Sequence, residues 1–262
     1  MSLMLYLFAG AIAGLLSGLF GVGGGAIIVP LLIFIFSKEI FLSSNIVHLA
    51  IGTSFATIIF TSLSSIQAHN RLGNIDWMIV KKLAPGLIIG VFIGSIFANH
   101  LKGSTLQAMI ALFLFFISFK IWREKPPKVL FNVISKKLLG LIGLLVGGMS
   151  AFFGIGGGSL VVPFLLSCKE KMSSAVACSA ACGLPIAFVG ALTYFWQGYS
   201  SENLPTFSTG YIYWPATIAI VLMSIPFAKL GVFLSERINE KKLKRGFSLI
   251  LAFIALQLVL NR

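Results

Sequence analysis

The chain has 262 residues, of which 58% are hydrophobic and only 10% are charged. Soluble domains carry about 25% charged residues, so the composition excludes a water-soluble protein and predicts one embedded in a lipid bilayer. The formal net charge of +13 would suggest nucleic acid as the partner of a soluble protein. In a membrane protein, basic loops hold the cytoplasmic ends of helices in place, and we therefore expect no nucleic-acid partner.

The apolar residues are grouped in stretches of roughly 18 to 25 residues, the length that crosses the hydrocarbon core as a helix. The alternation of apolar and polar residues that marks membrane strands is absent. We therefore predict an all-α polytopic membrane protein. In chain order, the apolar stretches are 3–36, 46–68, 78–99, 104–122, 138–167, 173–197, 211–234 and 243–261.

Two segments, 14–32 and 147–165, share one pattern at a constant offset of 133 residues. Both contain a Gly-Gly-Gly-x-x-x-x-Pro string, and ten of their positions are identical without a gap. The pattern predicts two related membrane repeats, 1–122 and 137–262, joined by a basic cytoplasmic linker, 123–136. Weaker similarity continues along the halves, where Ala50-Ile51-Gly52 resembles Ala181-Cys182-Gly183 and Gly94 falls opposite Gly231.

The Lys and Arg residues indicate how the two long stretches, 3–36 and 138–167, are placed. If each crossed the membrane once, the basic residues would divide about evenly between the two faces. If each is a hairpin that returns to its own side, sixteen of the twenty lie on one face, which is the bias expected of cytoplasmic loops. Lys229 lies inside a predicted span, from which it can snorkel to the basic side.

The hairpin arrangement leaves three further transmembrane helices in each half. Because three crossings reverse the direction of the chain, the second half is inverted relative to the first. We therefore predict two inverted repeats, each a glycine-broken hairpin plus three transmembrane helices. Inverted repeats are a recurring transporter design, with the substrate site near the midplane.

The glycine strings interrupt the two hairpins within the membrane. The eleven apolar residues 26–36 reach only about 16 Å as a helix, roughly half of the hydrocarbon thickness. The glycines would therefore turn the chain, and Pro30 and Pro163 fit best near a helix start. Free amides at a helix N-terminus attract anions. The strings predict an anion site where two helix starts meet, unless the glycines only allow tight helix packing. Its candidate residues are Gly23, Gly24, Gly25, Ala26, Gly156, Gly157, Gly158 and Ser159.

Hydroxyl groups inside the predicted spans would complete this site. In the stretch 46–68 they share one helical face that includes Thr61 and Ser64. They form either a hydroxyl-lined path or interhelical hydrogen bonds. Two further serines precede the glycine strings in equivalent places and either face the site or allow close packing. The candidate hydroxyl residues are Ser17, Thr53, Ser54, Thr57 and Ser150.

All seven acidic residues lie in loops or at the ends of predicted spans. Cation-coupled sites in membranes commonly use carboxylates, so the absence of carboxylates from mid-span favours an anionic or neutral substrate. Backbone carbonyls can still bind sodium, which leaves a proton or sodium open as the coupling ion.

The repeated glycine-proline pattern at 21–30 and 154–163, together with Gly52-Thr53-Ser54, resembles the sulfite exporter TauE/SafE family of membrane transporters. The resemblance covers essentially the whole chain. It implies a multi-pass protein of the bacterial cell inner membrane that transports sulfur-containing anions such as sulfite, thiosulfate or organosulfonates.

We predict a transporter that moves a small anion, of the sulfur-containing kind, by alternating access. The alternatives are an anion channel, which the sequence does not separate from a carrier, and a non-transporting membrane scaffold or assembly factor. An enzyme is not expected, because no carboxylate, HExxH or GxSG sequence lies within the predicted spans. The three cysteines show no metal-ligand spacing, and we expect no metal and no cofactor.

Overall fold

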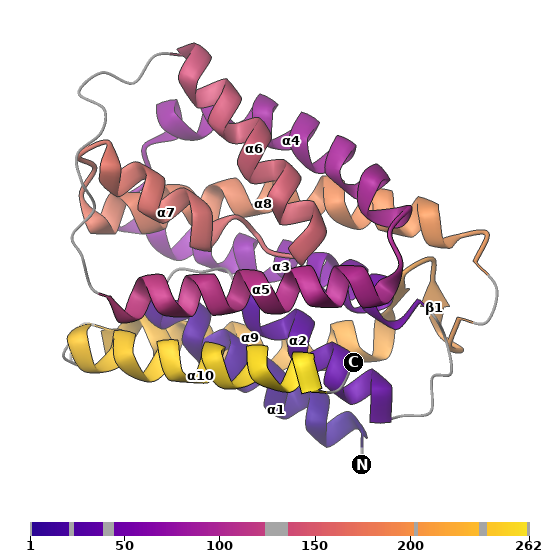
Figure 1. Cartoon of the computed structure of the whole chain (residues 1–262). Coiled ribbons are helices and arrows are strands. Elements are labelled where there is room, and N and C mark those ends of the chain that lie inside the picture. Colours follow the sequence, from indigo (N-terminus) through magenta and orange to yellow (C-terminus); the bar gives the residue numbers. More distant parts are fainter. Residues whose placement is uncertain are drawn as a thin grey trace.

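The computed structural model describes residues 2–20, 24–38, 45–123, 136–201, 204–235 and 240–260. Helices make up nearly all of this part and pack side by side (Figure 1). The first half contains α1 (Ser2–Phe20), α2 (Gly25–Lys38), α3 (Ile46–Arg71), α4 (Trp77–Asn99) and α5 (Gly103–Trp122). The second half contains α6 (Lys136–Phe153), α7 (Gly158–Ser167), α8 (Met172–Gly198), α9 (Trp214–Ser235) and α10 (Glu240–Leu260).

The predicted all-α membrane protein is confirmed. Helices α3, α4, α5, α8 and α9 are long and apolar enough to cross a bilayer. The remaining predicted span corresponds to α10, whose apolar part is the shorter segment Ser248–Leu260. The tryptophans stand at or near helix ends, where aromatic rings anchor membrane proteins at the interface; they are Trp77, Trp122, Trp196 and Trp214.

Each long apolar stretch is broken at its glycine string. In the first half α1 ends at Phe20 and α2 begins at Gly25. In the second half α6 ends at Phe153 and α7 begins at Gly158. Helix α2 has 14 residues and α7 has 10, and both are shorter than the about 20 residues that a spanning helix needs. The candidate residue Gly23 lies outside the described residues.

The two prolines lie deeper in their helices than the sequence suggested. Pro30 and Pro163 are each the sixth residue of α2 and α7, in the second turn instead of the first. A proline there has no N–H to donate to the carbonyl group four residues earlier. The carbonyl groups of Ala26 and Ser159 are therefore left without an intrahelical donor.

A short β-hairpin replaces the predicted start of the span at 211–234. Strands β1 (Ser208–Thr209) and β2 (Ile212–Tyr213) pair antiparallel before α9 begins. Gly210 makes the tight turn with a φ of 57°, which glycine adopts without strain. The Tyr213 amide then donates to Thr53 Oγ1 at 3.0 Å, which fixes the β-hairpin to α3.

The two halves interlock through close crossings of helices that carry glycine. Helix α1 packs along α9, and α4 packs along α6, each pair in parallel. A Cβ atom at Gly14 would collide with the Ser224 carbonyl oxygen, and one at Gly147 with the Leu87 carbonyl oxygen. The two contacts correspond through the repeat, because 14 and 147 differ by 133 residues and 87 and 224 by 137, the offset that also relates Gly94 to Gly231. Small residues of this kind let membrane helices approach closely.

Corresponding helices of the two halves meet and run antiparallel. Helix α3 crosses α8, and α5 lies along α10. In each crossing, residues early in one helix contact residues late in the other. The contacting pairs are Gly52 with Tyr194 and Ser62 with Gly183 for α3 and α8, and Gln107 with Leu258 and Ser118 with Ser248 for α5 and α10.

The basic loops gather at one end of the bundle, which we name the basic end (left in Figure 1). The starts of α4 and α8 meet there, because the Asp76 amide donates to Cys178 Sγ at 3.2 Å. The start of α6 lies beside that of α4, and the start of α10 lies beside the end of α5. The described basic positions at this end are Arg71, Lys81, Lys82, Lys120, Arg123, Lys136, Lys137, Lys169, Lys171, Lys241, Lys242, Lys244 and Arg245.

Candidate functional site

Both glycine strings form turns that suit glycine alone. Gly24 has a φ of 71° and Gly157 a φ of 80°, in the left-handed region that disfavours other residues. Each stands directly before the first residue of a short helix. The first amides of such a helix have no intrahelical acceptor, and none of those at 24–26 or 157–159 donates elsewhere within the described residues. Each turn therefore presents a set of free amide donors.

The two turns touch at the centre of the protein. A Cβ atom at Gly25 would lie 2.9 Å from Ile155 Cα and would also collide with the Gly154 carbonyl oxygen. The fully buried side chain of Ile58 fills the adjoining space and lies against both Gly25 and Gly156. An apolar side chain and a carbonyl oxygen, neither of which binds anions, therefore separate the two helix starts.

Three of the candidate hydroxyl residues take part in hydrogen bonds within the protein. Thr53 Oγ1 accepts from the Tyr213 amide, as described above. Ser54 Oγ donates to the Gly154 carbonyl oxygen at 2.9 Å, and Thr57 Oγ1 donates to the Ser54 carbonyl oxygen at 2.7 Å. All three residues are fully buried. Thr53 and Ser54 thus tie α3 to the β-hairpin and to the second turn, which is the structural alternative for this pair.

Two candidate serines of the second half keep their hydrogen-bonding capacity. Ser150 and Ser159 are buried, and their hydroxyl groups have no partner in the described part of the chain. Most buried hydroxyl groups are hydrogen-bonded, so these two are exceptions beside the second turn. Ser17, the counterpart of Ser150, is also buried but lines an open cavity.

This cavity lies beside the first turn and among α1, α3, α8 and α9. Ser17 Cβ lies 3.7 Å from the position that a Cβ atom would take at Gly24. The cavity volume of about 30 Å³ gives room for one or two water molecules. His69, in the last turn of α3, lines its side toward the basic end. The cavity therefore leads from the first glycine turn toward that end.

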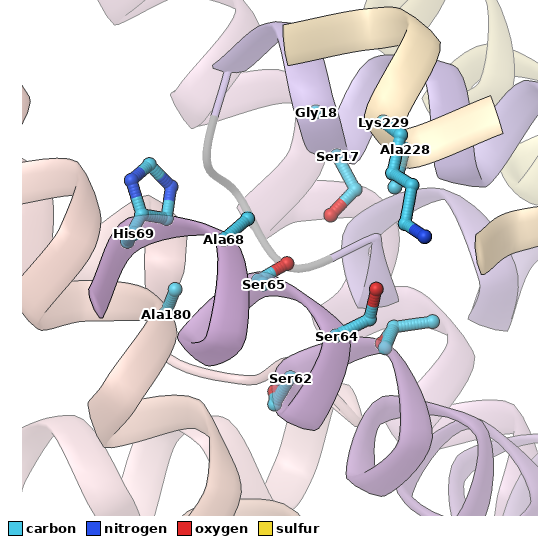
Figure 2. A pocket seen from close by; sticks show the side chains of 11 residues that line it. Ser17, Gly18, Ser62, Ser64, Ser65, Ala68, His69, Ala180, Ala228 and Lys229 are labelled. Carbon is cyan, nitrogen blue, oxygen red and sulfur yellow. The ribbon is translucent and has the colours of Figure 1, made fainter. Parts of the chain in front are cut away.

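Hydroxyl groups and one ammonium group surround the cavity. Figure 2 shows the oxygens of Ser17, Ser64 and Ser65 and the Nζ atom of Lys229 around one space. Thr61 and Ser62 complete this lining, and none of the described lining residues is acidic. The sequence placed Thr61 and Ser64 on a polar helix face, but it gave no role to Ser62, Ser65 or Lys229. The available signal was that Lys229 is a basic residue inside a span.

Aromatic rings close the bundle at the end opposite the basic end. The ring of Tyr213 in β2 makes edge-to-face contacts with Tyr6 of α1 and Phe36 of α2, at centroid distances of 6.2 and 5.7 Å. The ring of Tyr211 lies 5.4 Å from that of His48 and 6.4 Å from that of Tyr194. The β-hairpin therefore joins both halves at this end, and we name these six residues the aromatic seal.

Comparison with known proteins assigns the chain to a family. The sequence model described as sulfite exporter TauE/SafE matches residues 6–258. The chain belongs to the sulfite exporter TauE/SafE family. It is 35% identical over 260 residues to a probable membrane transporter protein of Haemophilus influenzae, covering 99% of this chain and 98% of that protein. A probable membrane transporter protein of Methanocaldococcus jannaschii is 29% identical over 262 residues, with 98% and 96% covered. The Bacillus subtilis protein YunE, also a probable membrane transporter protein, is 27% identical over 284 residues, with 99% and 98% covered.

Membership of the TauE/SafE family confirms the resemblance seen in the sequence and the prediction of a multi-pass membrane transporter. The described residues include no cluster of three His, Cys, Asp or Glu side chains that could hold a metal ion. What the site of this family member offers instead is a set of hydrogen-bond donors: free amides at two helix starts, unbonded serine hydroxyl groups and one lysine.

Proposed function

We propose that this TauE/SafE family member carries a small anion across the bacterial cell inner membrane by alternating access. The observation that carries the proposal is the cavity beside the first glycine turn, where hydroxyl groups and the Lys229 ammonium face one space without a carboxylate among the described lining residues. Donors of this kind stabilise negative charge and disfavour a cation. The family description, sulfite exporter, supports an oxidised sulfur anion or an organosulfonate as the substrate.

The amides of the two glycine turns form the deeper part of the proposed site. Helix starts favour anions because their free amides and the helix dipole both attract negative charge. Since Ile58 separates the two turns, we propose that the anion meets them in succession, first from the basic end and then from the opposite end. The proposed binding residues are Ser17, Gly24, Gly25 and Ala26 at the first turn, and Ser150, Gly156, Gly157, Gly158 and Ser159 at the second.

The two halves act in this proposal as inverted repeats. The antiparallel packing of α3 on α8 and of α5 on α10 supports this, because a two-fold axis that reverses spanning helices lies in the membrane plane. The many Lys and Arg positions at the basic end support a cytoplasmic location for that end. Inverted repeats commonly rock against each other to expose a midplane site to either side in turn.

The proposed cycle starts from a state open toward the cytoplasm. The cavity opens toward the basic end, while the aromatic seal closes the other end. Export or import would require the rings of the seal to separate as the cavity closes. A coupling ion, either a proton or sodium, is part of the proposal, and the free carbonyl groups of Ala26 and Ser159 are suitable ligands for sodium.

Thermal shift and counterflow measurements test the substrate class and the carrier mechanism. We expect sulfite, thiosulfate or methanesulfonate to raise the melting temperature of the purified protein, and acetate to leave it unchanged. In proteoliposomes a carrier accumulates labelled substrate in exchange for unlabelled substrate, whereas a channel does not. A protein that responds to none of these anions would contradict the anion proposal and favour a scaffold, and binding without counterflow would favour a channel.

A matched pair of glycine substitutions tests the site. Gly24→Leu should abolish counterflow while the protein stays in the membrane, because the leucine side chain would cover the free amides. Gly73→Leu is the control: Gly73 has a similar φ of 68° but no atom within 4 Å of a Cβ position, so it introduces the same backbone strain away from the site. Normal counterflow by Gly24→Leu would exclude the first turn as a binding site.

A further inference from the structure

Lys229 is a cation without a partner in the apolar part of α9. It lies in the part of the helix that is apolar enough to span a bilayer, and its side chain is directed toward the cavity (Figure 2). Within the described residues it makes no hydrogen bond, ion pair or ring contact. Other lysine and arginine side chains do find such contacts: Lys38 Nζ lies 4.5 Å from the ring centroid of Phe34, and the guanidinium of Arg123 lies 4.5 Å from that of Phe119. A charge at this depth is costly and normally marks a substrate or ion pathway.

The serine hydroxyl groups of the cavity are also unbonded, unlike serines elsewhere in the helices. Serine within a helix commonly donates to the carbonyl group three or four residues earlier. Ser37, Ser95 and Ser167 do so, at 2.7, 2.8 and 2.9 Å. The four cavity serines make no such bond in the described structure, and their hydroxyl groups stay available to a ligand; they are Ser17, Ser62, Ser64 and Ser65.

The packing of α9 on α1 fixes Lys229 beside Ser17. Two residues beyond Lys229, a Cβ atom at Gly231 would lie 3.1 Å from Gly18 Cα and would collide with the Leu15 carbonyl oxygen. The backbones of the two helices therefore touch within one turn of both side chains. Because Ser17 also adjoins Gly24, an anion held by Lys229 would lie on the way to the first glycine turn.

The directions of the donors indicate the shape of the ligand. They come from three helices, α1, α3 and α9, and surround one space. A planar carboxylate presents two oxygens, whereas a sulfite or sulfonate group presents three oxygens arranged around the sulfur atom. Lysine contributes a compact charge with three donors of its own. A pyramidal or tetrahedral oxyanion group therefore satisfies more of these donors than a carboxylate does.

We propose that Lys229 selects the charge of the substrate at a loading site that it forms with Ser17, Ser62, Ser64 and Ser65, and that the ligand group is an oxyanion with at least three oxygens. This inference rests on the proposed anion transport and adds the residue that recognises the charge. It also makes the two repeats unequal, because the position of the first half that corresponds to Lys229 is Phe92. The rival explanation is that Lys229 extends to lipid headgroups at the basic end.

Binding of methanesulfonate to the purified full-length protein, measured by isothermal titration calorimetry, separates the two explanations. We expect Lys229→Gln to weaken the affinity by about tenfold or more, the usual result of removing one partner of a desolvated charge pair. Lys229→Arg should stay within about threefold of the wild type. Lys81→Gln removes an exposed charge at the same end and should change nothing. An affinity within twofold of wild type for Lys229→Gln would overturn the inference, whereas wild-type protein that binds no anion would overturn the proposed function itself.

Chemical restoration of the charge provides a second test that does not depend on the stability of Lys229→Gln. In a chain whose three native cysteines are replaced by alanine, Lys229→Cys should bind methanesulfonate weakly. Modification with a reagent that adds an aminoethyl group should restore binding, and one that adds a sulfonatoethyl group should not. Equal effects of the two reagents would overturn a role of the charge.

Discussion

Two corresponding regions of the repeats, one at each end of the bundle, have diverged in opposite directions. In the first half, the cavity is lined by Thr61, Ser62, Ser64 and Ser65 of α3. At the offset of 131 residues that relates α3 to α8, these positions become Leu192, Thr193, Phe195 and Trp196. The hydroxyl group that remains, on Thr193, accepts from Ser95 Oγ at 2.9 Å and donates to the Val189 carbonyl oxygen at 2.8 Å. The second region is therefore apolar or internally bonded where the first is open.

The connecting segments differ in the same sense. Five residues join α3 to α4, whereas fifteen join α8 to α9 and include the β-hairpin. The extra length supplies Tyr211 and Tyr213, which pack into the aromatic seal. The comparison teaches that a duplicated scaffold can keep its helix crossings while one end becomes a polar entrance and the other a closed apolar contact.

The largest effect is expected where the halves are still alike. Gly14→Leu and Gly147→Leu should each lower the free energy of unfolding by about 3 kcal/mol, because each side chain would collide with a carbonyl oxygen of the facing helix. Denaturant titration in detergent micelles measures the change. Gly140→Leu is the control, since a Cβ atom there meets nothing within 4 Å. Destabilisation by only one of the two substitutions would show that the crossings are not equivalent.

A smaller effect should reveal the aromatic seal as a gate. Tyr211→Leu removes two ring contacts and the 2.7 Å hydrogen bond with Ser201 Oγ, together about 1.5 kcal/mol of support for the closed state. The open population should therefore rise about tenfold. Labelling of Ser150→Cys by an impermeant maleimide from the end opposite the basic end, in a chain without native cysteines, should speed up by the same factor.

A matched aromatic substitution controls this labelling experiment. Trp196 is 78% exposed at the same end of the bundle and makes no contact with the seal that the structure describes. Trp196→Leu should leave the labelling rate unchanged. An unchanged rate for Tyr211→Leu as well would mean that the β-hairpin does not control access to Ser150.

The smallest effect concerns a hydroxyl group that has no counterpart in the second half. Thr53→Val removes the acceptor of the Tyr213 amide and should cost about 1 kcal/mol of stability; the corresponding residue is Leu184. Hydrogen exchange of the Tyr213 amide, followed by mass spectrometry, should become faster. Thr57→Val, which loses a bond only within its own helix, should leave that exchange unaltered. Equal exchange in both variants would remove Thr53 as the anchor of the β-hairpin.

The sequence predicted those parts of the fold that depend on local patterns. The runs of apolar residues located the helices, and three adjacent glycines located the breaks, because positive φ at Gly24 and Gly157 is a local requirement. The β-hairpin escaped because Ile212 and Tyr213 are as apolar as the helix that follows them. Hydropathy alone cannot separate two strand residues from the start of a span.

The parts of the site that depend on distant contacts could not be read in this way. Ile58 is one of many aliphatic residues in the sequence, and only the packing of the two turns shows that it lies between them. Lys229 has the same composition signal as a lysine that snorkels to the interface. Its importance appears only when α9 is placed beside Ser17 and the serines of α3.

The glycine crossings also constrain how the protein is made. Gly14 of α1 waits for Ser224 of α9, which follows 210 residues later in the chain. At a synthesis rate of about 5–20 residues per second, the first helix spends roughly 10 to 40 s in the membrane before its partner leaves the ribosome. During that time its row of glycines faces lipid or a temporary protein neighbour. Membrane insertion of this chain is therefore a delayed assembly, in which the oldest helix is among the last to acquire its native contacts.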